Sequence, residues 1–311
     1  MAPRATSQLR ALLKNQEPLL VPMAYDAVTA LVIEEAGFKA VGTSGSNIAA
    51  SVLGVPDIAL TTLTEMVTQN RNIVNAVRVP VIADADTGYG TALNVRRTVR
   101  EYEGCGLAGL FFEDQVHPKR CGHYEGTQVI PVEQMEQKIR AALEARRDSD
   151  FVIIARTDAR SSLGLEEAIN RGNRYAAAGA DVVFVEAPLS KEELVELPKR
   201  IKAPLLVNMV EGGKTPLLTA AELAALGYRI IIYPDTLMTA AVFGMRQAMA
   251  ALMRDGVTTA VQGNMVGFHP LQELLRFTEF AELQQRYRDT DARQPAPKTS
   301  AGMYQQRGEI P

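Results

Sequence analysis

FVIIA (residues 151–155) and VVFVE (residues 182–186) are runs of almost continuous apolar residues, and they favour one class of fold. A strand that is buried on both faces needs this composition, which is typical of parallel sheets covered by helices. Six further strand-length runs occur elsewhere in the chain, and longer stretches with helical spacing separate the runs. The eight expected strands are residues 19–23, 40–43, 79–83, 109–113, 151–155, 182–186, 205–208 and 229–233.

Eight strand-then-helix units in about 250 residues predict an α/β fold, the closed (β/α)8 TIM barrel. An open, doubly wound sheet is the alternative, but it rarely reaches eight regular units. The clearest expected helices are residues 60–77, 92–105, 132–147 and 165–178.

The C-terminal part of the chain departs from this pattern. We expect an additional helix over residues 271–289, which would pack outside the barrel or on a neighbouring subunit. From about residue 290 the composition becomes polar with interspersed Pro and Gly. We therefore predict a single barrel domain with its helical extension over residues 1–290 and a flexible tail over residues 291–311.

Composition narrows the possible partners. The 311 residues carry a formal net charge of −3 with 22% charged residues, so no basic surface is indicated for nucleic acid or for anionic lipid. No apolar run is long enough to span a membrane. Two cysteines cannot form a disulfide framework, and no secretory signal opens the chain. A cytoplasmic enzyme with a small-molecule substrate fits these features.

IADADTGYG (residues 82–90) gives the sharpest site prediction. Side chains two positions apart on an extended chain point the same way, so Asp84 and Asp86 can face one point above the barrel mouth. Glu113, at the end of the next strand, can add a third carboxylate. Adjacent ionised carboxylates are costly without a cation between them, and such oxygen ligands favour Mg²⁺ or Mn²⁺ over zinc. The alternative is that an aspartate caps the helix starting near Ala92.

Two other strand ends suit an anionic ligand. Arg156, in IIARTDA (residues 153–159), can bind a carboxylate or phosphate in bidentate fashion, or it can pair with Asp158 or Glu186. TSGS (residues 43–46) offers hydroxyls and free backbone N–H groups ahead of a helical stretch, although it could equally form only a turn.

The loop PKRCGHYEG (residues 118–126) contains Cys121. Lys119, Arg120 and His123 place positive charge around this thiol, which would lower its pKa and suit a proton donor or nucleophile. Zinc binding by His117, Cys121 and His123 is disfavoured because no fourth ligand is near in the sequence. The other cysteine, Cys105, we interpret as a packed small hydrophobic residue.

Two apparent nucleotide motifs fail on context. GCGLAG (residues 104–109) precedes a strand, whereas a dinucleotide fingerprint follows one. EGGKTP (residues 211–216) lacks the first glycine of a phosphate-binding loop, because that position is Asn208.

Taken in order, DADTGYG (84–90), EDQ (113–115), KRCGH (119–123) and ARTDA (155–159) make the sequence similar to the isocitrate lyase and phosphoenolpyruvate mutase superfamily. The resemblance covers about residues 8–290 and is strongest to the methylisocitrate lyase, 2,3-dimethylmalate lyase and carboxyphosphonoenolpyruvate phosphonomutase members. It implies a barrel whose last helix is exchanged between subunits of a homotetramer, a dimer of dimers. It also implies Mg²⁺ held by Asp84 and Asp86, with Glu113 nearby.

The resemblance further implies roles for individual residues. Catalytic roles fall to Cys121 as proton donor, to Tyr25 as a base near the metal and to Asp57. The residues that match substrate contacts in the superfamily are Ser44, Gly45, Ser46, Gly122, His123, Arg156, Glu186 and Asn208.

The implied activity is cleavage of a 2-hydroxy di- or tricarboxylate, of the 2-methylisocitrate or 2,3-dimethylmalate type, to pyruvate or another 2-oxo acid plus a carboxylate. Methylisocitrate lyases, as we align them, have an arginine shortly after the Tyr-Pro of strand eight, where this chain has Asp235 and Thr239. A substituted dicarboxylate is therefore the favoured substrate. The phosphonomutases carry a similar cysteine loop, so formation of a phosphorus–carbon bond by phosphoryl migration remains the alternative.

Overall fold

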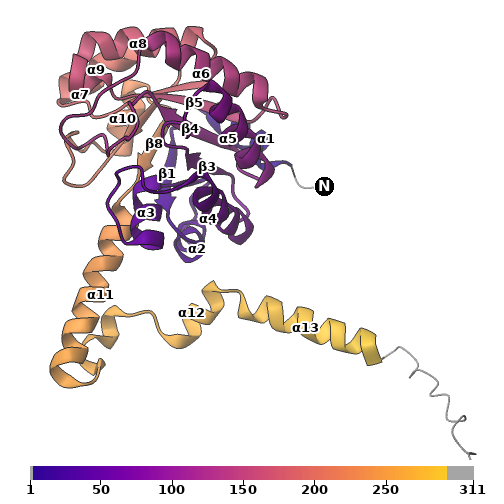
Figure 1. Ribbon diagram of the computed structural model, residues 1–311. Coiled ribbons are helices and arrows are strands. Elements are labelled where there is room, and N and C mark those ends of the chain that lie inside the picture. The colour runs from indigo at the N-terminus through magenta and orange to yellow at the C-terminus, as the bar shows by residue number, and fades with distance from the viewer. Residues whose placement is uncertain (1–2, 293–311) are drawn as a thin grey trace, which may run out of the picture. The chain divides into compact units, whose positions relative to one another are not determined.

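The computed structural model describes residues 3–292, and its centre is a closed barrel of eight parallel strands. The strands follow one another around the barrel in chain order, and the last pairs with the first (Figure 1). They are β1 (Leu19–Ala24), β2 (Val41–Thr43), β3 (Val81–Asp84), β4 (Gly109–Glu113), β5 (Val152–Thr157), β6 (Val182–Val185), β7 (Leu205–Asn208) and β8 (Ile230–Tyr233). The predicted TIM barrel is confirmed, and the open sheet is excluded.

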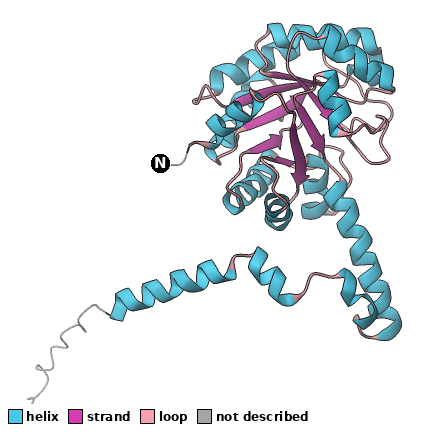
Figure 2. Cartoon of the chain, turned by 180° about the vertical axis from the view of Figure 1, so that it is seen from behind, coloured by secondary structure: helices cyan, strands magenta, loops and turns pink. Residues whose placement is uncertain are grey.

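Helices surround the strands on the outside of the barrel (Figure 2). They are α2 (Ala27–Glu35), α3 (Gly45–Leu53), α4 (Leu63–Ala76), α5 (Ala92–Gly104), α6 (Val132–Ala145), α7 (Ala159–Leu163), α8 (Leu165–Ala177), α9 (Lys191–Arg200) and α10 (Ala220–Leu226). Helix α11 (Thr236–Asp255) follows β8 and extends away from the barrel (Figure 1). The four helices predicted most clearly correspond to α4, α5, α6 and α8. Within residues 3–292, none of the helices combines the length and apolar character needed to cross a bilayer.

The core has two layers because each strand buries side chains on both faces. In β5, Val152 and Ile154 belong to the cluster that fills the barrel, whereas Ile153 and Ala155 belong to the cluster between the strands and the helices. All four side chains are fully buried. This alternation explains why FVIIA reads as a continuous apolar run.

A helix that was not predicted from the sequence, α1 (Ala5–Leu13), closes the N-terminal end of the barrel. Its Leu9 is fully buried within the cluster that fills the barrel. Ser7 donates a hydrogen bond to Asp150 (2.7 Å), and Arg10 pairs with Asp181 (2.8 Å), in the segments that precede β5 and β6. The opposite, C-terminal end of the barrel is left for the site.

By its contacts the chain divides into two compact units, residues 1–265 and residues 266–311. The first contains the barrel and a 3-10 helix, η1 (Thr259–Asn264); the second contains α12 (Phe268–Leu274) and α13 (Phe277–Ala292). One unbroken helix was expected over residues 271–289, and this prediction is wrong. Arg276 has a φ of 58°, in the left-handed region, which a right-handed helix cannot include.

The prediction of one domain over residues 1–290, with an exchanged C-terminal helix, concerns how these two units associate, and it stays a prediction. The predicted flexible tail lies outside the described residues, apart from its first two positions, which end α13.

Candidate active site

A small cavity of about 50 Å³ lies at the C-terminal mouth of the barrel, where active sites of this fold are found. Its walls come from the ends of all eight strands and from the segment of residues 114–130 that follows β4, which we call the Cys121 loop. The structure brings most of the predicted site residues to this wall. Those that line it are Ser44, Ser46, Asp57, Asp84, Cys121, Gly122, His123, Arg156, Glu186 and Asn208.

Asp84 and Asp86 lie side by side at the end of β3, and neither caps a helix. Oδ1 of Asp84 accepts a hydrogen bond from the backbone N of Asp86 (2.9 Å), and Oδ2 accepts one from the backbone N of Gly45 (3.1 Å). Burial, followed by the charge of Asp86, raises the pKa of Asp84 to about 6. Thr91 is the N-cap of α5, and Asn94 bonds to it, so the capping alternative is excluded.

Glu113, which ends β4, is fully buried, and neither of its carboxylate oxygens has a hydrogen-bond partner among the described residues. Burial raises the pKa of this carboxyl group well above its usual value. A buried carboxylate without partners is costly, and a bound cation is one way to stabilise it.

The oxygens of Asp84, Asp86 and Glu113 are of the kind that Mg²⁺ prefers, so the donor set fits this ion. Within residues 3–292, however, no three His, Cys, Asp or Glu side chains form a ready-made ligand group. A metal here would therefore need water or substrate oxygens to complete its coordination, which is usual for Mg²⁺. The assignment of the three carboxylates as ligands stays a prediction.

Lys119, from the Cys121 loop, places a cation in this acidic cluster, which was not predicted from the sequence. Its Nζ lies 2.6 Å from a carboxylate oxygen of Asp57 and 2.6 Å from one of Asp86. Burial acts to lower the pKa of Lys119, but the surrounding carboxylates, Asp86 first, raise it well above its usual value. The ion pairs therefore hold the loop to the barrel mouth.

The thiol of Cys121 differs from its prediction. Burial is the largest influence on it and raises the pKa of Cys121 to about 11, and the carboxylates of Glu186 and Asp57 act in the same direction. The predicted lowering of this pKa is wrong because Lys119 pairs with carboxylates and the thiol is mostly buried. Cys121 is therefore protonated near neutral pH, the state of a proton donor and not of a thiolate nucleophile.

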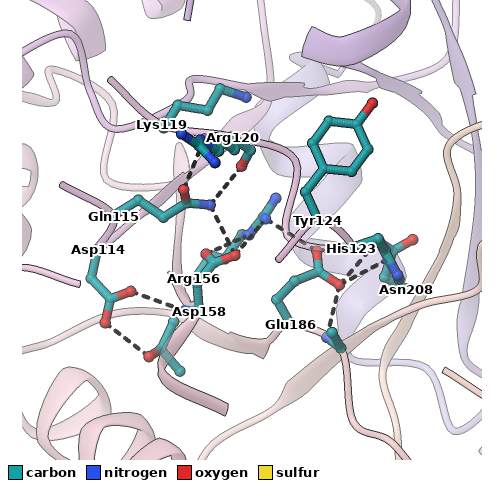
Figure 3. A network of polar contacts seen from close by, with 12 residues as sticks. Asp114, Gln115, Lys119, Arg120, His123, Tyr124, Arg156, Asp158, Glu186 and Asn208 are labelled. Atoms are coloured by element: carbon teal, nitrogen blue, oxygen red, sulfur yellow. Dashed lines mark hydrogen bonds and ion pairs between the residues drawn. The ribbon is translucent and has the colours of Figure 1, made fainter. Parts of the chain in front are cut away.

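Arg156 lies at the centre of a polar network in the same cavity wall (Figure 3). Its Nε and Nη2 donate to the two carboxylate oxygens of Asp158 (3.0 and 2.8 Å), and Nη2 lies 3.3 Å from Glu186. The ion-pair alternative raised from the sequence is thus realised with both partners. Among the described residues, Nη1 is the guanidinium nitrogen left for a ligand in the cavity.

Glu186 joins Arg156 to the loop and to β7. Burial acts to raise its pKa, but the Arg156 guanidinium and the neighbouring His123 lower the pKa of Glu186 to about 2. Nε2 of His123 lies 3.4 Å from Oε1 of Glu186. Asn208 donates its amide to Glu186 (3.2 Å), while its buried Oδ1 has no partner among the described residues. That oxygen is available to a substrate hydroxyl.

Gly122 lies where the Cys121 loop meets this network. A Cβ built on Gly122 would approach Cγ of Glu186 to 2.4 Å, and Nη2 of Arg156 and Oδ1 of Asp158 to 2.7 Å each. Only glycine therefore allows the loop backbone to come this close to the Arg156 pair.

The TSGS segment differs in part from its prediction. Ser44 is the N-cap of α3, and its hydroxyl oxygen accepts a hydrogen bond from the backbone N of Asn47 (3.3 Å). The backbone N–H of Gly45 was expected to be free, but it donates to Asp84. The hydroxyls of Ser44 and Ser46 can still donate into the cavity that both residues line.

Tyr25 and Asp57 have different positions relative to the cavity. Asp57 lines the cavity, whereas Tyr25 is buried and is not one of the residues that line it. Burial, followed by the charge of Asp26, raises the pKa of Tyr25. The role of Tyr25 as a base near the metal stays a prediction.

The family model described as phosphoenolpyruvate phosphomutase matches residues 9–253 of this chain. The chain belongs to that family. A 2,3-dimethylmalate lyase of Eubacterium barkeri is 47% identical over 281 residues, which are 90% of this chain and 97% of the relative. The predicted superfamily and the carbon–carbon lyase class of its named relatives are thereby confirmed.

Solved structures agree with this membership. Oxaloacetate acetylhydrolase in complex with 3,3-difluorooxalacetate is 37% identical, with a TM-score of 0.87 over 91% of this chain and 97% of that one. A phosphonopyruvate hydrolase in complex with oxalate and Mg²⁺ is 32% identical, with a TM-score of 0.81 over 94% of this chain and 99% of that one.

Several residues of the site were not predicted from the sequence. Lys214 belongs to the rejected EGGKTP segment, yet its backbone N donates to Nδ1 of His123 (3.0 Å) and its Nζ to the backbone O of Tyr124 (3.1 Å). Gln115 and Asp158, each inside a quoted motif, connect the loop to Arg156. The motifs that contain them were the available signal, but no spacing rule indicates these contacts.

Proposed function

We propose that this protein is a Mg²⁺-dependent carbon–carbon lyase that cleaves a small 2-hydroxy dicarboxylate to a 2-oxo acid and a carboxylate. The observation that carries the proposal is the position of Cys121 on the wall of the cavity that Arg156 also lines, where burial raises the pKa of its thiol. Cleavage of a carbon–carbon bond leaves a carbanion that needs a proton, whereas phosphoryl migration between oxygen and carbon transfers none. The relationship to a 2,3-dimethylmalate lyase supports the same choice.

The proposed reaction is a retro-aldol cleavage between C2 and C3. The C2 hydroxyl gives its proton to a carboxylate of the wall, for which Asp57 is available. The O–H electrons form the carbonyl bond of the 2-oxo acid, and the electrons of the C2–C3 bond remain on the departing fragment as an enediolate. Cys121 then protonates C3, and its thiolate recovers a proton before the next turnover.

Charge stabilisation on the departing fragment is assigned to the polar wall. The enediolate carries more negative charge than the substrate carboxylate, so donors aimed at it favour the transition state. Nη1 of Arg156 and the hydroxyls of Ser44 and Ser46 are the donors placed for this. The Cys121 loop, held by Lys119, excludes water that would otherwise protonate the intermediate.

Mg²⁺, or Mn²⁺ in its place, is the proposed cofactor, held by Asp84 and Asp86 with Glu113 nearby. When bound, it supplies Lewis-acid stabilisation to the oxygens of the 2-oxo acid. The partnerless oxygens of Glu113 support this assignment, as does the Mg²⁺ in the related phosphonopyruvate hydrolase structure. Calorimetric titration with Mg²⁺ should detect binding that Asp84→Asn weakens, and EDTA should abolish turnover reversibly.

Charge favours a dicarboxylate over a tricarboxylate. Arg156 is the one arginine among the described residues that line the cavity. Asp235 also lines it, and burial raises the pKa of this carboxyl group. A third substrate carboxylate would therefore meet an acidic side chain where it needs a cation.

An assay with Mg²⁺ over a panel of 2-hydroxy di- and tricarboxylates tests the proposal. We expect pyruvate or another 2-oxo acid from 2,3-dimethylmalate-type substrates, and slower turnover of 2-methylisocitrate. A preference for the tricarboxylate would contradict the substrate class. Formation of a phosphorus–carbon bond, with no turnover of any hydroxy acid, would establish the phosphonomutase alternative.

We further propose a homotetramer, a dimer of dimers with an exchanged C-terminal helix. Helix α11 exposes large apolar side chains, among them Phe243 (66% exposed), Met249 (56% exposed) and Met253 (91% exposed). In the second unit, Phe268 is 73% exposed. Apolar surface of this extent is typical of an interface. Light scattering after size exclusion should give a mass near four chains.

Both cysteines are free, which suits the proposed cytoplasmic setting.

A further inference from the structure

We propose that Gln115 is a positioning residue that sets the closed Cys121 loop in register with Arg156. Its Oε1 accepts a hydrogen bond from the backbone N of Arg120 (3.0 Å), and its Nε2 donates to the backbone O of the same residue (2.8 Å). Nε2 also donates to Oδ1 of Asp158 (3.0 Å), as Figure 3 shows. One amide thus joins the backbone next to Cys121 to the carboxylate that holds Arg156.

Gln115 is itself fixed at the base of the loop. It forms an antiparallel bridge with Val129, and its neighbours continue that pairing: Val116 N donates to Gln128 O (2.8 Å), and Ile130 N donates to Asp114 O (2.8 Å). The side chain of Gln115 is 2% exposed. Its amide therefore projects from a fixed backbone toward the tip of the loop.

The partner on the barrel side is also fixed. Asp158 accepts two hydrogen bonds from Arg156, and its backbone N donates to the buried carboxylate of Asp114 (2.9 Å). Asp114 in turn accepts from Tyr175 (2.6 Å) and Arg171 (3.0 Å). Asp158 is thus held in place. The Lys119 ion pairs hold the loop to the barrel mouth, and the amide adds the contact that aligns the loop with Arg156.

The contacts of the amide also determine its orientation. Oε1 faces a donor, the N–H of Arg120, while Nε2 faces two acceptors, the Arg120 carbonyl and the Asp158 carboxylate. A side chain that presents oxygen at both positions cannot make this set of bonds. Because Cys121 follows Arg120 directly, loss of the set would displace the thiol that donates the proton.

Two variants separate the bonds from the shape of the side chain. Gln115→Glu keeps the size but places an oxygen opposite two acceptors, and Gln115→Met keeps a similar volume without donors or charge. Gln128→Glu is the matched control, because Gln128 is an exposed glutamine at the base of the same loop. The readouts are trypsin cleavage after Lys119 and Arg120 without substrate, kcat and KM with substrate, and the melting temperature.

In both Gln115 variants we expect cleavage at least about tenfold faster than in the wild type and a fall in kcat of about 100-fold, with KM changed less than about tenfold. Gln128→Glu should match the wild type. Cleavage and kcat within about twofold of wild type in both Gln115 variants would overturn the proposal. So would a lower melting temperature as the only change, or equal changes in Gln128→Glu.

The kinetic readout rests on the proposed lyase function, but the cleavage readout does not. If the wild type turns over no hydroxy acid while cleavage responds to Gln115, the proposed function fails and the role of Gln115 in loop closure stands. If turnover is found and neither readout responds, the role of Gln115 fails alone.

Discussion

Replacing Gly122 by alanine should prevent the Cys121 loop from closing. The added Cβ would lie 2.4 Å from Cγ of Glu186 and 2.7 Å from Nη2 of Arg156. These neighbours are paired with each other and with Asp158, so none can give way alone. Overpacking of this kind costs about 1–3 kcal/mol. Because an open loop escapes the clash, this cost falls on closure and lowers the ratio of closed to open loop about 5- to 150-fold.

The assay for Gly122→Ala combines kcat/KM with trypsin cleavage after Lys119 and Arg120. Cleavage should rise and kcat/KM should fall, and the product of the two changes should equal the fall in the closed-to-open ratio, while the melting temperature stays close to wild type. Gly104→Ala is the control, because a Cβ at Gly104 meets nothing within 4 Å. Wild-type kcat/KM and wild-type cleavage in Gly122→Ala would refute the close approach of the loop to Arg156.

Three further predictions concern the thiols and the barrel. Cys121→Ser should lower kcat by about 10²- to 10⁴-fold, because a hydroxyl is a far weaker acid than a thiol, while Mg²⁺ binding by calorimetry stays unchanged; full activity would remove Cys121 from the mechanism. Burial raises the pKa of Cys105 from 9.0 to about 11, so the unfolded chain loses this proton at lower pH than the folded one. The free energy of unfolding should therefore fall between about pH 9 and 11, by up to roughly 2.7 kcal/mol from this thiol. Denaturant unfolding of Cys105→Ala should show a smaller fall over the same pH range. An equal fall in the variant would contradict the raised pKa of Cys105. Leu9→Ala should lower the free energy of unfolding by about 2–5 kcal/mol in urea and leave kcat unchanged, since Leu9 fills the end of the barrel opposite the site; a cost under 1 kcal/mol would show that α1 does not close the barrel.

The strands and the position of the site were predictable because both follow from short-range pattern. A strand covered on both faces must be apolar throughout, so FVIIA and VVFVE could be recognised as buried strands from the sequence. Polar residues directly after such runs, such as Asp84 and Arg156, must then emerge at one end of the barrel. Helix α1 was missed because its role depends on contacts with distant segments, Leu9 inside the far end of the barrel and Arg10 with Asp181, which the local sequence does not reveal.

The errors at the site have a common physical cause. Near Cys121 the sequence shows three potential cations, which predicts a lowered thiol pKa. In the fold, Lys119 pairs with Asp57 and Asp86, and burial of the thiol outweighs what remains. The Gly45 N–H, expected to bind a ligand, donates to Asp84 for the same reason. Buried polar groups take the nearest partner in space.

The sequence by itself determined the barrel, the wall on which the chemistry lies and the identity of most groups in it, because strand periodicity and strand ends are local properties of the chain. Only the tertiary structure decided how those groups are paired and which protonation state they hold. The pKa of Cys121 and the bond from Gln115 to Asp158 depend on burial and on residues tens of positions away, such as Asp57 and Asp158. Burial and electrostatic pairing act through space, and the order of residues alone does not specify them.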